Sequence, residues 1–352
     1  MSQRGPTTIA DRHLFNAVVD ARSPTEFAED HLPDALNLPV LDDEERRIVG
    51  TLYKQHGAFE ARRLGGGMVA ANLGRHLRHR LAGMPSTWKP LVYCWRGGMR
   101  SGAMVTWLRM AGWDAQQLQG GYKRWRQHVI ETIAHIAPQL PLQVLCGPTG
   151  SAKTRVLHAL AAQGAQVIDL EGLARHKGSL LGQWPGQAQP SQKAFETQLA
   201  AVLEGLDLNR PVFIEAESRK IGQIALPTPL VERLRAAPCL EICASQEARL
   251  AYLLSDYAYL GDDPTALARR LWALREAHGG QVVAQWQAWA QSHALAPLFE
   301  ALATQHYDPL YARSQSGNFK LWAERRAIPA TSLDDTGIEH VAQAVVAAVA
   351  RP

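Results

Sequence analysis

Short apolar runs alternate with stretches of helical periodicity through the first 136 residues of the chain. Residues 15–20 and 91–94 each form an apolar run with the length of a buried strand. Helical patterns begin at residue 24 and extend over 101–111 and 122–136. A strand, a turn and a helix in that order favour an α/β domain, which we predict to span residues 10–136.

A second region of the same kind follows Pro138 and Pro141, which predict a linker over residues 137–141. Residues 142–146, 167–169, 212–215 and 240–243 predict further buried strands. Beyond residue 264 the pattern is mostly helical. We therefore predict a second α/β domain over residues 142–352, with a helical C-terminal part.

Composition narrows the class of protein. Hydrophobic residues make up 46% and charged residues 20%, which is typical of a globular chain. No apolar run approaches the roughly 20 residues of a membrane-spanning helix, and the first residues lack the apolar segment of a secretory signal, so we expect no membrane partner and a cytoplasmic location. The net charge of +4 permits an anionic partner. Four cysteines, among them Cys239 and Cys243, predict neither a disulfide framework nor a metal site.

The first candidate for chemistry is Cys94, between a predicted strand and a predicted helix. A helix N-terminus and flanking arginines both stabilise a thiolate. Glycines allow the loop to curl so that its backbone N–H groups bind an anion. We therefore predict Cys94 and Arg100 as catalytic residues, and as the rest of the anion cradle Arg96, Gly97, Gly98, Met99 and Ser101.

This part of the chain resembles a rhodanese domain. The resemblance rests on residues 20–27, 31–39, 94–101 and 118–125, and it implies that Cys94 carries sulfur or selenium. Five residues separate Cys94 from Arg100, whereas common sulfurtransferase loops have four. Five is also the spacing of cysteine phosphatases, so a phosphatase or an arsenate-reductase-like enzyme stays open as an alternative.

The second candidate is a Gly-rich turn, residues 147–154, that follows a predicted strand and opens a helix. This is the context of a P-loop, whose backbone amides cradle phosphates. For diphosphate binding we predict Gly147, Gly150, Ser151, Lys153 and Thr154. Ala152 stands where the pattern expects glycine, which departs from standard nucleotide-binding geometry.

Acidic and basic residues supply further candidates. Asp169, Glu215 and Glu217 follow predicted strands and could act as acids or hold Mg²⁺, although each could equally be structural. Leu180, Leu181 and Trp184 could line an apolar slot or belong to a core. Clustered basic residues bind RNA phosphates, and as candidates for tRNA we predict Arg75, Arg78, Arg80, Lys123, Arg124, Arg219 and Lys220.

The whole chain resembles the tRNA 2-selenouridine synthase family, in residues 39–46, 94–101, 147–154, 170–179 and 214–222. The resemblance implies an N-terminal rhodanese-like α/β domain followed by a P-loop NTPase-like α/β domain. It also implies conversion of wobble 2-thiouridine in tRNA to 2-selenouridine through an S-geranyl intermediate.

The resemblance further implies the substrates. Geranyl diphosphate would lie in the P-loop, and selenophosphate, supplied by a selenophosphate synthetase, would load selenium on Cys94 as a perselenide. No tightly bound cofactor is expected, apart from Mg²⁺ at the diphosphate. A regulatory ATPase or RNA-binding module with an inactive rhodanese half is the other alternative, and it predicts that Cys94→Ala has no effect.

Overall fold

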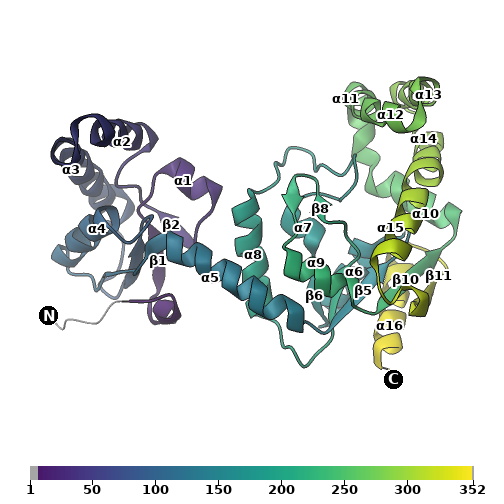
Figure 1. Ribbon diagram of the computed structural model, residues 1–352, viewed down its shortest axis with the longest axis horizontal. Helices are drawn as coiled ribbons and strands as arrows, with labels where there is room; N and C mark the ends of the chain where they lie inside the picture. The colour runs from purple at the N-terminus through teal and green to yellow at the C-terminus, as the bar shows by residue number, and fades with distance from the viewer. Residues whose placement is uncertain (1–6, 351–352) are drawn as a thin grey trace. The chain divides into compact units, whose positions relative to one another are not determined.

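The computed structural model describes residues 7–350 (Figure 1). It divides into two compact units. Unit 1 consists of Met1–Thr132 with Pro190–Ala201, and unit 2 consists of Ile133–Gln189 with Val202–Pro352. The division falls inside two helices, α5 (Gly121–Ile136) and α8 (Gln192–Glu204), so each of these helices contributes residues to both units.

Unit 1 contains a parallel sheet of four strands in the order β2-β1-β3-β4. The strands are β1 (Ala17–Asp20), β2 (Ala35–Asn37), β3 (Pro90–Tyr93) and β4 (Gln116–Gln117). The central strands β1 and β3 are almost wholly buried, which explains why their sequences are apolar runs without alternation. Both strands lie within a residue or two of the predicted runs.

Helices and short helical turns complete unit 1. They are η1 (Ala10–Leu14), α1 (Pro24–Glu29), α2 (Asp43–His56), α3 (Ala58–Arg75), the π-helical turn η2 (His76–Arg80), α4 (Met99–Met110) and the first part of α5. Pro24 starts α1 behind a capping box at Ser23, and Asp42 caps α2 in the same way. The core lies between the sheet, α3 and α4, where Leu73, Val92 and Met104 are buried.

A buried ionic network connects α1, α5 and α8 within unit 1. The guanidinium of Arg22 donates to Asp20 and to the carbonyl of Asp30, and its carbon lies 3.8 Å from the ring centroid of Tyr122. The Asp30 carboxylate accepts hydrogen bonds from the hydroxyls of Tyr122 (2.8 Å) and Thr197 (3.1 Å). Because Thr197 belongs to α8, residues far along the chain complete the core of unit 1.

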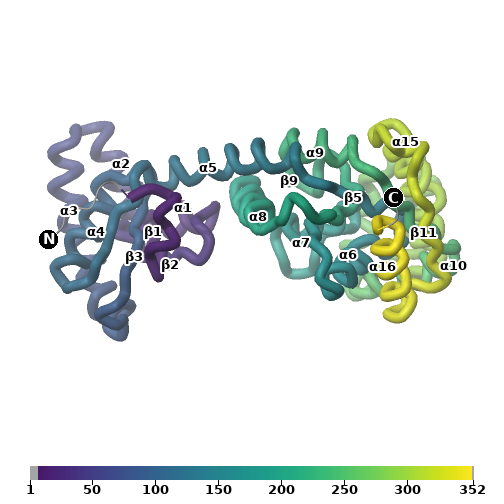
Figure 2. The backbone as a smooth tube through the Cα atoms, turned by 90° about the horizontal axis from the view of Figure 1, so that it is seen from below, coloured from purple at the N-terminus to yellow at the C-terminus, as the bar shows by residue number. Residues whose placement is uncertain are grey.

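Unit 2 contains a parallel sheet of five strands in the order β11-β10-β5-β7-β6. The strands are β5 (Leu142–Cys146), β6 (Gln166–Ile168), β7 (Val212–Glu215), β10 (Cys239–Ala244) and β11 (Arg326–Ala330). Figure 2 shows α6 (Lys153–Ala162) and α16 (Asp335–Ala350) side by side, and both pack against buried strand residues such as Leu145 and Ile242. The other elements around this sheet are η3 (Ala137–Gln139), α7 (Leu170–Ala174), α9 (Thr228–Arg235) and the hairpin β8 (Lys220–Ile221) with β9 (Ile224–Ala225).

The C-terminal part of unit 2 is helical until it returns to the sheet. Its elements are α10 (Gln246–Asp256), η4 (Ala258–Asp262), α11 (Pro264–Leu271), η5 (Trp272–Leu274), α12 (Arg275–His278), α13 (Gly280–Gln291), α14 (Leu295–Ala301), the π-helical turn η6 (Leu302–Tyr307), α15 (Asp308–Asn318) and η7 (Trp322–Glu324). A second core forms here around the buried side chains of Trp286, Leu298 and Phe299. No helix in residues 7–350 is both long enough and apolar enough to cross a membrane.

The predicted fold class, two α/β domains of which the second has a helical C-terminal part, is confirmed. The structure adds β11 to the sheet of unit 2, in a region for which the sequence predicted mostly helix, and α16 is a helix as predicted for that region. The predicted linker holds the short turn η3 directly after α5. The predicted boundaries 10–136, 137–141 and 142–352 stay predictions.

Candidate functional site

The first site is the thiol loop, residues 94–101, which connects β3 to α4. The Cys94 side chain is buried, with 3% of the residue exposed. Its Sγ accepts a hydrogen bond from the backbone N–H of Gly98 (3.3 Å) and lies 3.1 Å from the Ser101 hydroxyl. Two donors therefore point at one sulfur, an arrangement that stabilises negative charge on it.

The start of α5 supports the thiol loop through backbone hydrogen bonds. The backbone N–H of Tyr122 donates to the Cys94 carbonyl (2.8 Å), and that of Lys123 donates to the Trp95 carbonyl (2.9 Å). Gly121 has a φ of +56°, and a Cβ there would meet the Cys94 carbonyl oxygen and lie 2.5 Å from the backbone nitrogen of Gly97. Only glycine fits this contact, so the Gly120–Gly121 pair is part of the thiol loop's support.

The other predicted residues of the cradle lie around Cys94 in different ways. Ser101 is buried against the sulfur, whereas Met99 is 67% exposed. Arg100 donates to Glu26 of α1 (2.5 Å), and this guanidinium, against the opposing effect of burial, lowers the pKa of Glu26. Arg96 and Gly97 line a separate cavity of about 400 Å³, whose lining does not include Cys94.

The second site is the P-loop, residues 147–154, between β5 and α6. Ala152 immediately precedes α6 and has left-handed backbone angles, with a φ of 56° and a ψ of 29°. An L side chain in this conformation costs about 1–2 kcal/mol relative to glycine. Ala152 therefore takes the conformation that glycine would provide, and its methyl group packs among buried residues of the unit 2 core.

Two predicted residues of the P-loop have partners inside the protein. The Lys153 ammonium donates to the Gly147 carbonyl (2.9 Å), and the Gly147 N–H donates to the hydroxyl of Tyr311. Tyr311 comes from α15, and its ring centroid lies 5.5 Å from the Lys153 nitrogen. An aromatic side chain from the C-terminal helices thus lies directly against the phosphate-binding turn.

A cavity of about 570 Å³ opens at the P-loop, and this volume is typical of a small-molecule site. Gly150, Lys153 and Thr154 line it, as do Lys177 and several tyrosines. Gly147 and Ser151 do not line it. The Ser151 hydroxyl is buried and has no hydrogen-bond partner among residues 7–350. Of the predicted diphosphate residues, the structure brings three to the cavity.

Carboxylates surround the P-loop threonine. The Thr154 hydroxyl lies 2.9 Å from a Glu171 oxygen and 2.8 Å from a Glu215 oxygen, and the Glu171 N–H donates to Glu215 (3.0 Å). Burial, together with the charge of Asp169, raises the pKa of Glu215 to about 7. Burial and the charge of Glu215 raise the pKa of Glu217, which lines the cavity, to about 8.

Glu171 was not predicted from the sequence, although it lines the cavity and bonds to Thr154. Burial and the charges of Glu215 and Glu217 raise its pKa well above the ordinary value. Asp169, which was predicted, caps α7 by accepting from the Gly172 N–H (2.7 Å), and it also contacts His158. Asp169 lies two residues before Glu171, and this proximity was the sequence feature that could have pointed to Glu171.

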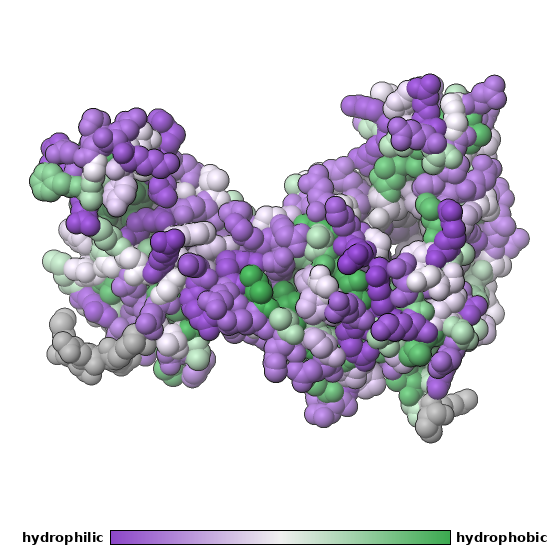
Figure 3. All heavy atoms as spheres, viewed as in Figure 1, coloured by the Kyte–Doolittle hydropathy of each residue, from purple (hydrophilic) through white to green (hydrophobic). Residues whose placement is uncertain are grey.

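Metal and RNA candidates complete the description of the sites. Among residues 7–350, no group of three or more His, Cys, Asp or Glu is arranged to hold a metal ion. The candidate tRNA residues are all exposed, namely Arg75, Arg78, Arg80, Lys123, Arg124, Arg219 and Lys220. Arg124 forms an ion pair with Glu131. Figure 3 shows that hydrophilic side chains predominate over α2 and α3, the helices that lead to the first cluster of these arginines.

Comparison with known proteins adds the family. Residues 8–128 match the rhodanese-like domain, and residues 140–270 match the tRNA 2-selenouridine synthase AAA domain. The chain is similar to the tRNA 2-selenouridine synthase of Nitrosomonas europaea, with 40% identity over 71% of this chain and 64% of that protein's length. The chain thus spans slightly less than two thirds of this relative.

Two other relatives with the same name match over more of their length. Identity with the protein of Shewanella pealeana is 34%, over 84% of this chain and 87% of the relative. Identity with the protein of Aeromonas salmonicida is 33%, over 97% of this chain and 99% of the relative. With both family models matched and a relative similar along almost its whole length, the chain belongs to the tRNA 2-selenouridine synthase family.

Proposed function

We propose that this protein converts 2-thiouridine at the wobble position of tRNA to 2-selenouridine, in two chemical steps. One observation carries the proposal. A single chain builds two separate anion cradles, one around the Cys94 sulfur and one at a P-loop whose cavity has an aromatic wall. The family of the chain supports the same reaction.

The first step is alkylation of the uridine by geranyl diphosphate, bound at the P-loop of unit 2. The sulfur at C2 attacks C1 of the geranyl chain, so that a C–S bond forms, a C–O bond breaks and diphosphate leaves. Lys153 and the backbone at Gly150 stabilise the charge that develops on the diphosphate. Loss of the Lys153 contact with Gly147 frees this ammonium for the phosphate oxygens.

Mg²⁺ fits the oxygen atoms around Thr154. One hydroxyl and two carboxylates, those of Glu171 and Glu215, lie within hydrogen-bond distance there. Mg²⁺ is commonly held by one or two carboxylates together with substrate phosphates, which needs no cluster of three acidic ligands. When bound, the ion would supply positive charge beside the diphosphate. Burial, together with the charges of neighbouring carboxylates, raises the pKa values of Glu171 and Glu215, and a cation beside them would favour their charged forms.

The second step replaces sulfur by selenium and involves the thiol loop of unit 1. Alkylated sulfur is the better leaving group, and geranylthiol departs from C2. The Cys94 thiolate attacks the phosphorus of selenophosphate, the product of a selenophosphate synthetase, so that an S–P bond forms, the P–Se bond breaks and hydroselenide leaves. Hydroselenide then forms the C–Se bond at C2 as geranylthiol departs, and water releases phosphate from Cys94. The Gly98 N–H and the Ser101 hydroxyl stabilise the charged sulfur group. Arg100, held by Glu26, orients the start of α4 from which these donors come.

The test is a reconstitution with 2-thiouridine tRNA, geranyl diphosphate and selenophosphate, followed by mass spectrometry of the nucleosides. The unmodified protein should yield 2-selenouridine. Cys94→Ala should stop at the geranylthio nucleoside, and Lys153→Ala should lose geranylation. Phosphoester hydrolysis dependent on Cys94, with the nucleoside unchanged, would assign the protein to the phosphatases instead. ATP turnover that does not depend on Cys94 would point to a regulatory ATPase.

A further inference from the structure

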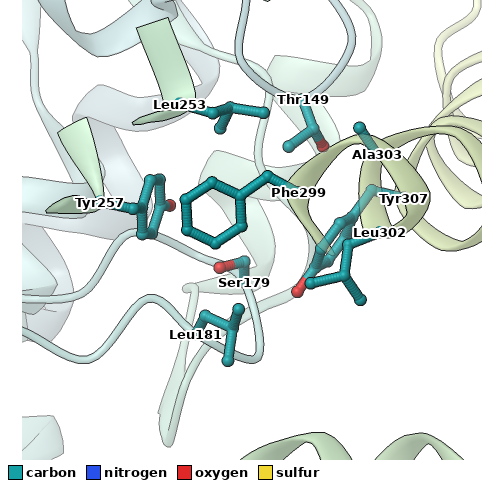
Figure 4. A pocket seen from close by; sticks show the side chains of 9 residues that line it. All are labelled: Thr149, Ser179, Leu181, Leu253, Tyr257, Phe299, Leu302, Ala303 and Tyr307. Carbon is teal, nitrogen blue, oxygen red and sulfur yellow. The ribbon is translucent and has the colours of Figure 1, made fainter. Parts of the chain in front are cut away.

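A small apolar pocket adjoins the P-loop cavity (Figure 4). We call it the apolar slot. Its walls are mainly the apolar side chains of Leu181, Leu253, Phe299, Leu302 and Ala303 and the ring of Tyr257, and Thr149, Ser179 and Tyr307 complete the lining. Its volume is about 30 Å³, and no charged side chain lines it. The rings of Tyr257 and Phe299 meet at an angle of 68°, with centroids 6.2 Å apart. An empty space with such walls favours a hydrocarbon group over water.

The apolar slot begins at the phosphate-binding turn itself. Thr149 of the P-loop lines both the slot and the cavity, and so do Leu253 and Tyr257. Gly150 packs so closely on Leu253 that a Cβ at Gly150 would lie 2.9 Å from the Leu253 Cγ. A ligand held by the P-loop therefore has an apolar recess within immediate reach, on the same side as Gly150.

One part of the cavity wall continues this apolar character, while charged and polar side chains such as Asp256 and Gln315 line other parts. Tyr252, Leu310 and Tyr311 line it beside Tyr257 and Tyr307. The slot of about 30 Å³ is too small for the base of a nucleotide and has few polar groups to pair with its ring nitrogens and amino groups. The site is therefore suited to a molecule with a phosphate head and a hydrocarbon tail.

We propose that the apolar slot binds the far end of the chain of a prenyl diphosphate, and that Phe299 and Ala303 set the chain length. This inference rests on the proposed function, because the diphosphate must lie at the P-loop. Since the slot holds little more than the terminal methyl groups, the rest of the chain lies in the cavity against the tyrosines. Burial of these last carbon atoms distinguishes a ten-carbon chain from a five-carbon one.

The experiment compares prenylation of 2-thiouridine tRNA by dimethylallyl, geranyl and farnesyl diphosphate. Ala303→Leu fills the slot, and we expect kcat/KM for geranyl diphosphate to fall on the order of tenfold, with dimethylallyl diphosphate changed less than about twofold. The matched control is Ala301→Leu, two residues earlier at a site that is also buried and does not line the slot. Its ratio of geranyl to dimethylallyl activity should stay that of the unmodified protein.

A second variant acts in the opposite direction. Phe299→Leu enlarges the slot, and we expect farnesyl diphosphate to gain several-fold relative to geranyl diphosphate. Retained binding of inorganic diphosphate shows that a variant is folded, and Phe299→Leu decides the matter alone if Ala303→Leu does not fold.

The outcomes separate the two proposals. Unchanged chain-length ratios in folded variants overturn the slot and leave the proposed function standing. An unmodified protein that prenylates with none of the three diphosphates overturns both.

Discussion

The thiol loop and the P-loop are built on the same plan, a buried parallel strand followed by a glycine turn and a helix, yet they differ in what surrounds them. Backbone and side chains fill the space around the Cys94 sulfur, and the cavity that Arg96 and Gly97 line does not include Cys94. Gln117 donates to the Gly97 and Gly98 carbonyls, and two N–H groups of α5 hold the carbonyls of Cys94 and Trp95. The P-loop instead faces a cavity of about 570 Å³.

The difference suits each loop to the step that we propose for it. The thiol loop directs fixed donors at one buried sulfur, so it suits a small group carried on that atom. At the P-loop, the lysine, the threonine and the carboxylates have one another or the turn as partners. A ligand there exchanges these internal contacts for its own, so binding at the P-loop is coupled to rearrangement and to protonation of the carboxylates.

Gly121→Ala is the strongest test of the close packing between the start of α5 and the thiol loop. The added Cβ collides with the backbone of Cys94 and Gly97, and the backbone keeps a φ of +56° that alanine disfavours. Strain and collision together should destabilise unit 1 by on the order of 3 kcal/mol. Hydrogen exchange of β3 and of the start of α5 would measure this, and prenylation by unit 2 should persist.

Gly112→Ala is the matched control for that variant. Gly112 also has a positive φ, +102°, but a Cβ there meets nothing within 4 Å. It carries the backbone strain without the collision and should be the milder of the two. Equal effects in both variants would show that close packing under the thiol loop is not what fixes it.

The next test concerns the carboxylates and pH. Burial raises the pKa of Glu217 from an ordinary 4.5 to about 8, and that of Glu215 to about 7. Because the folded pKa values of these acids are raised, the folded protein favours their protonated forms. The stability they contribute is complete below about pH 4.5 and is lost as the pH rises through 7 and 8. Because Glu217 is partly exposed, solvent screens much of the energy that the full pKa shift would give. Glu217→Gln should therefore stabilise β7 and its neighbours at pH 9 by about 2 kcal/mol, and leave them unchanged at pH 4.5.

Hydrogen exchange at the two pH values measures that difference. Glu232→Gln, which removes an exposed carboxylate from α9 of the same unit, is the control and should show no pH-dependent gain. A gain of equal size at both pH values would mean that Glu217 stays ionised in the folded protein at pH 4.5, contrary to its raised pKa.

The sequence was sufficient for features that are local along the chain. Both loops, the strands before them and the helices after them follow from apolar runs and glycine spacing. β11 was not predicted because its segment, Arg326–Ala330, is short and contains Pro329. Proline is compatible with an edge strand but does not indicate a strand in the sequence. The place of β11 in the sheet depends on pairing with β10, a contact between distant segments.

The site shows the same limit. Gly150, Lys153 and Thr154 were readable because one motif holds them together. Glu171 and Tyr311 join the P-loop only through the fold, Glu171 by bonding to Thr154 and Tyr311 by accepting from Gly147. Asp169 and Glu171 lie two residues apart after the same predicted strand, so the sequence does not distinguish their roles. In the structure Asp169 caps the start of α7, whereas Glu171 lines the cavity.

A smaller effect is expected from Ser101→Ala in the thiol loop. The Ser101 hydroxyl lies 3.1 Å from the Cys94 sulfur, and a hydrogen bond of this kind is worth about 1 kcal/mol. Alkylation of Cys94 at pH 7, followed by peptide mass spectrometry, should slow about fivefold, since that energy corresponds to roughly this ratio. Thr106→Ala removes another α4 hydroxyl, one bonded to Gly102, and should leave the rate unchanged. A faster reaction in Ser101→Ala would mean that the hydroxyl shields the sulfur more than it stabilises it.

The smallest effect is expected where the P-loop departs from its motif, at Ala152. Ala152→Gly relieves about 1–2 kcal/mol of left-handed strain. It also removes a buried methyl group worth about 0.8 kcal/mol and adds up to about 1 kcal/mol of freedom to the unfolded chain. These contributions nearly cancel, so stability should change by less than about 1 kcal/mol, in contrast to Gly121→Ala. Thermal unfolding of the two variants side by side measures the contrast. A large loss in Ala152→Gly would mean that the methyl group, by packing in the unit 2 core, fixes the conformation of the P-loop.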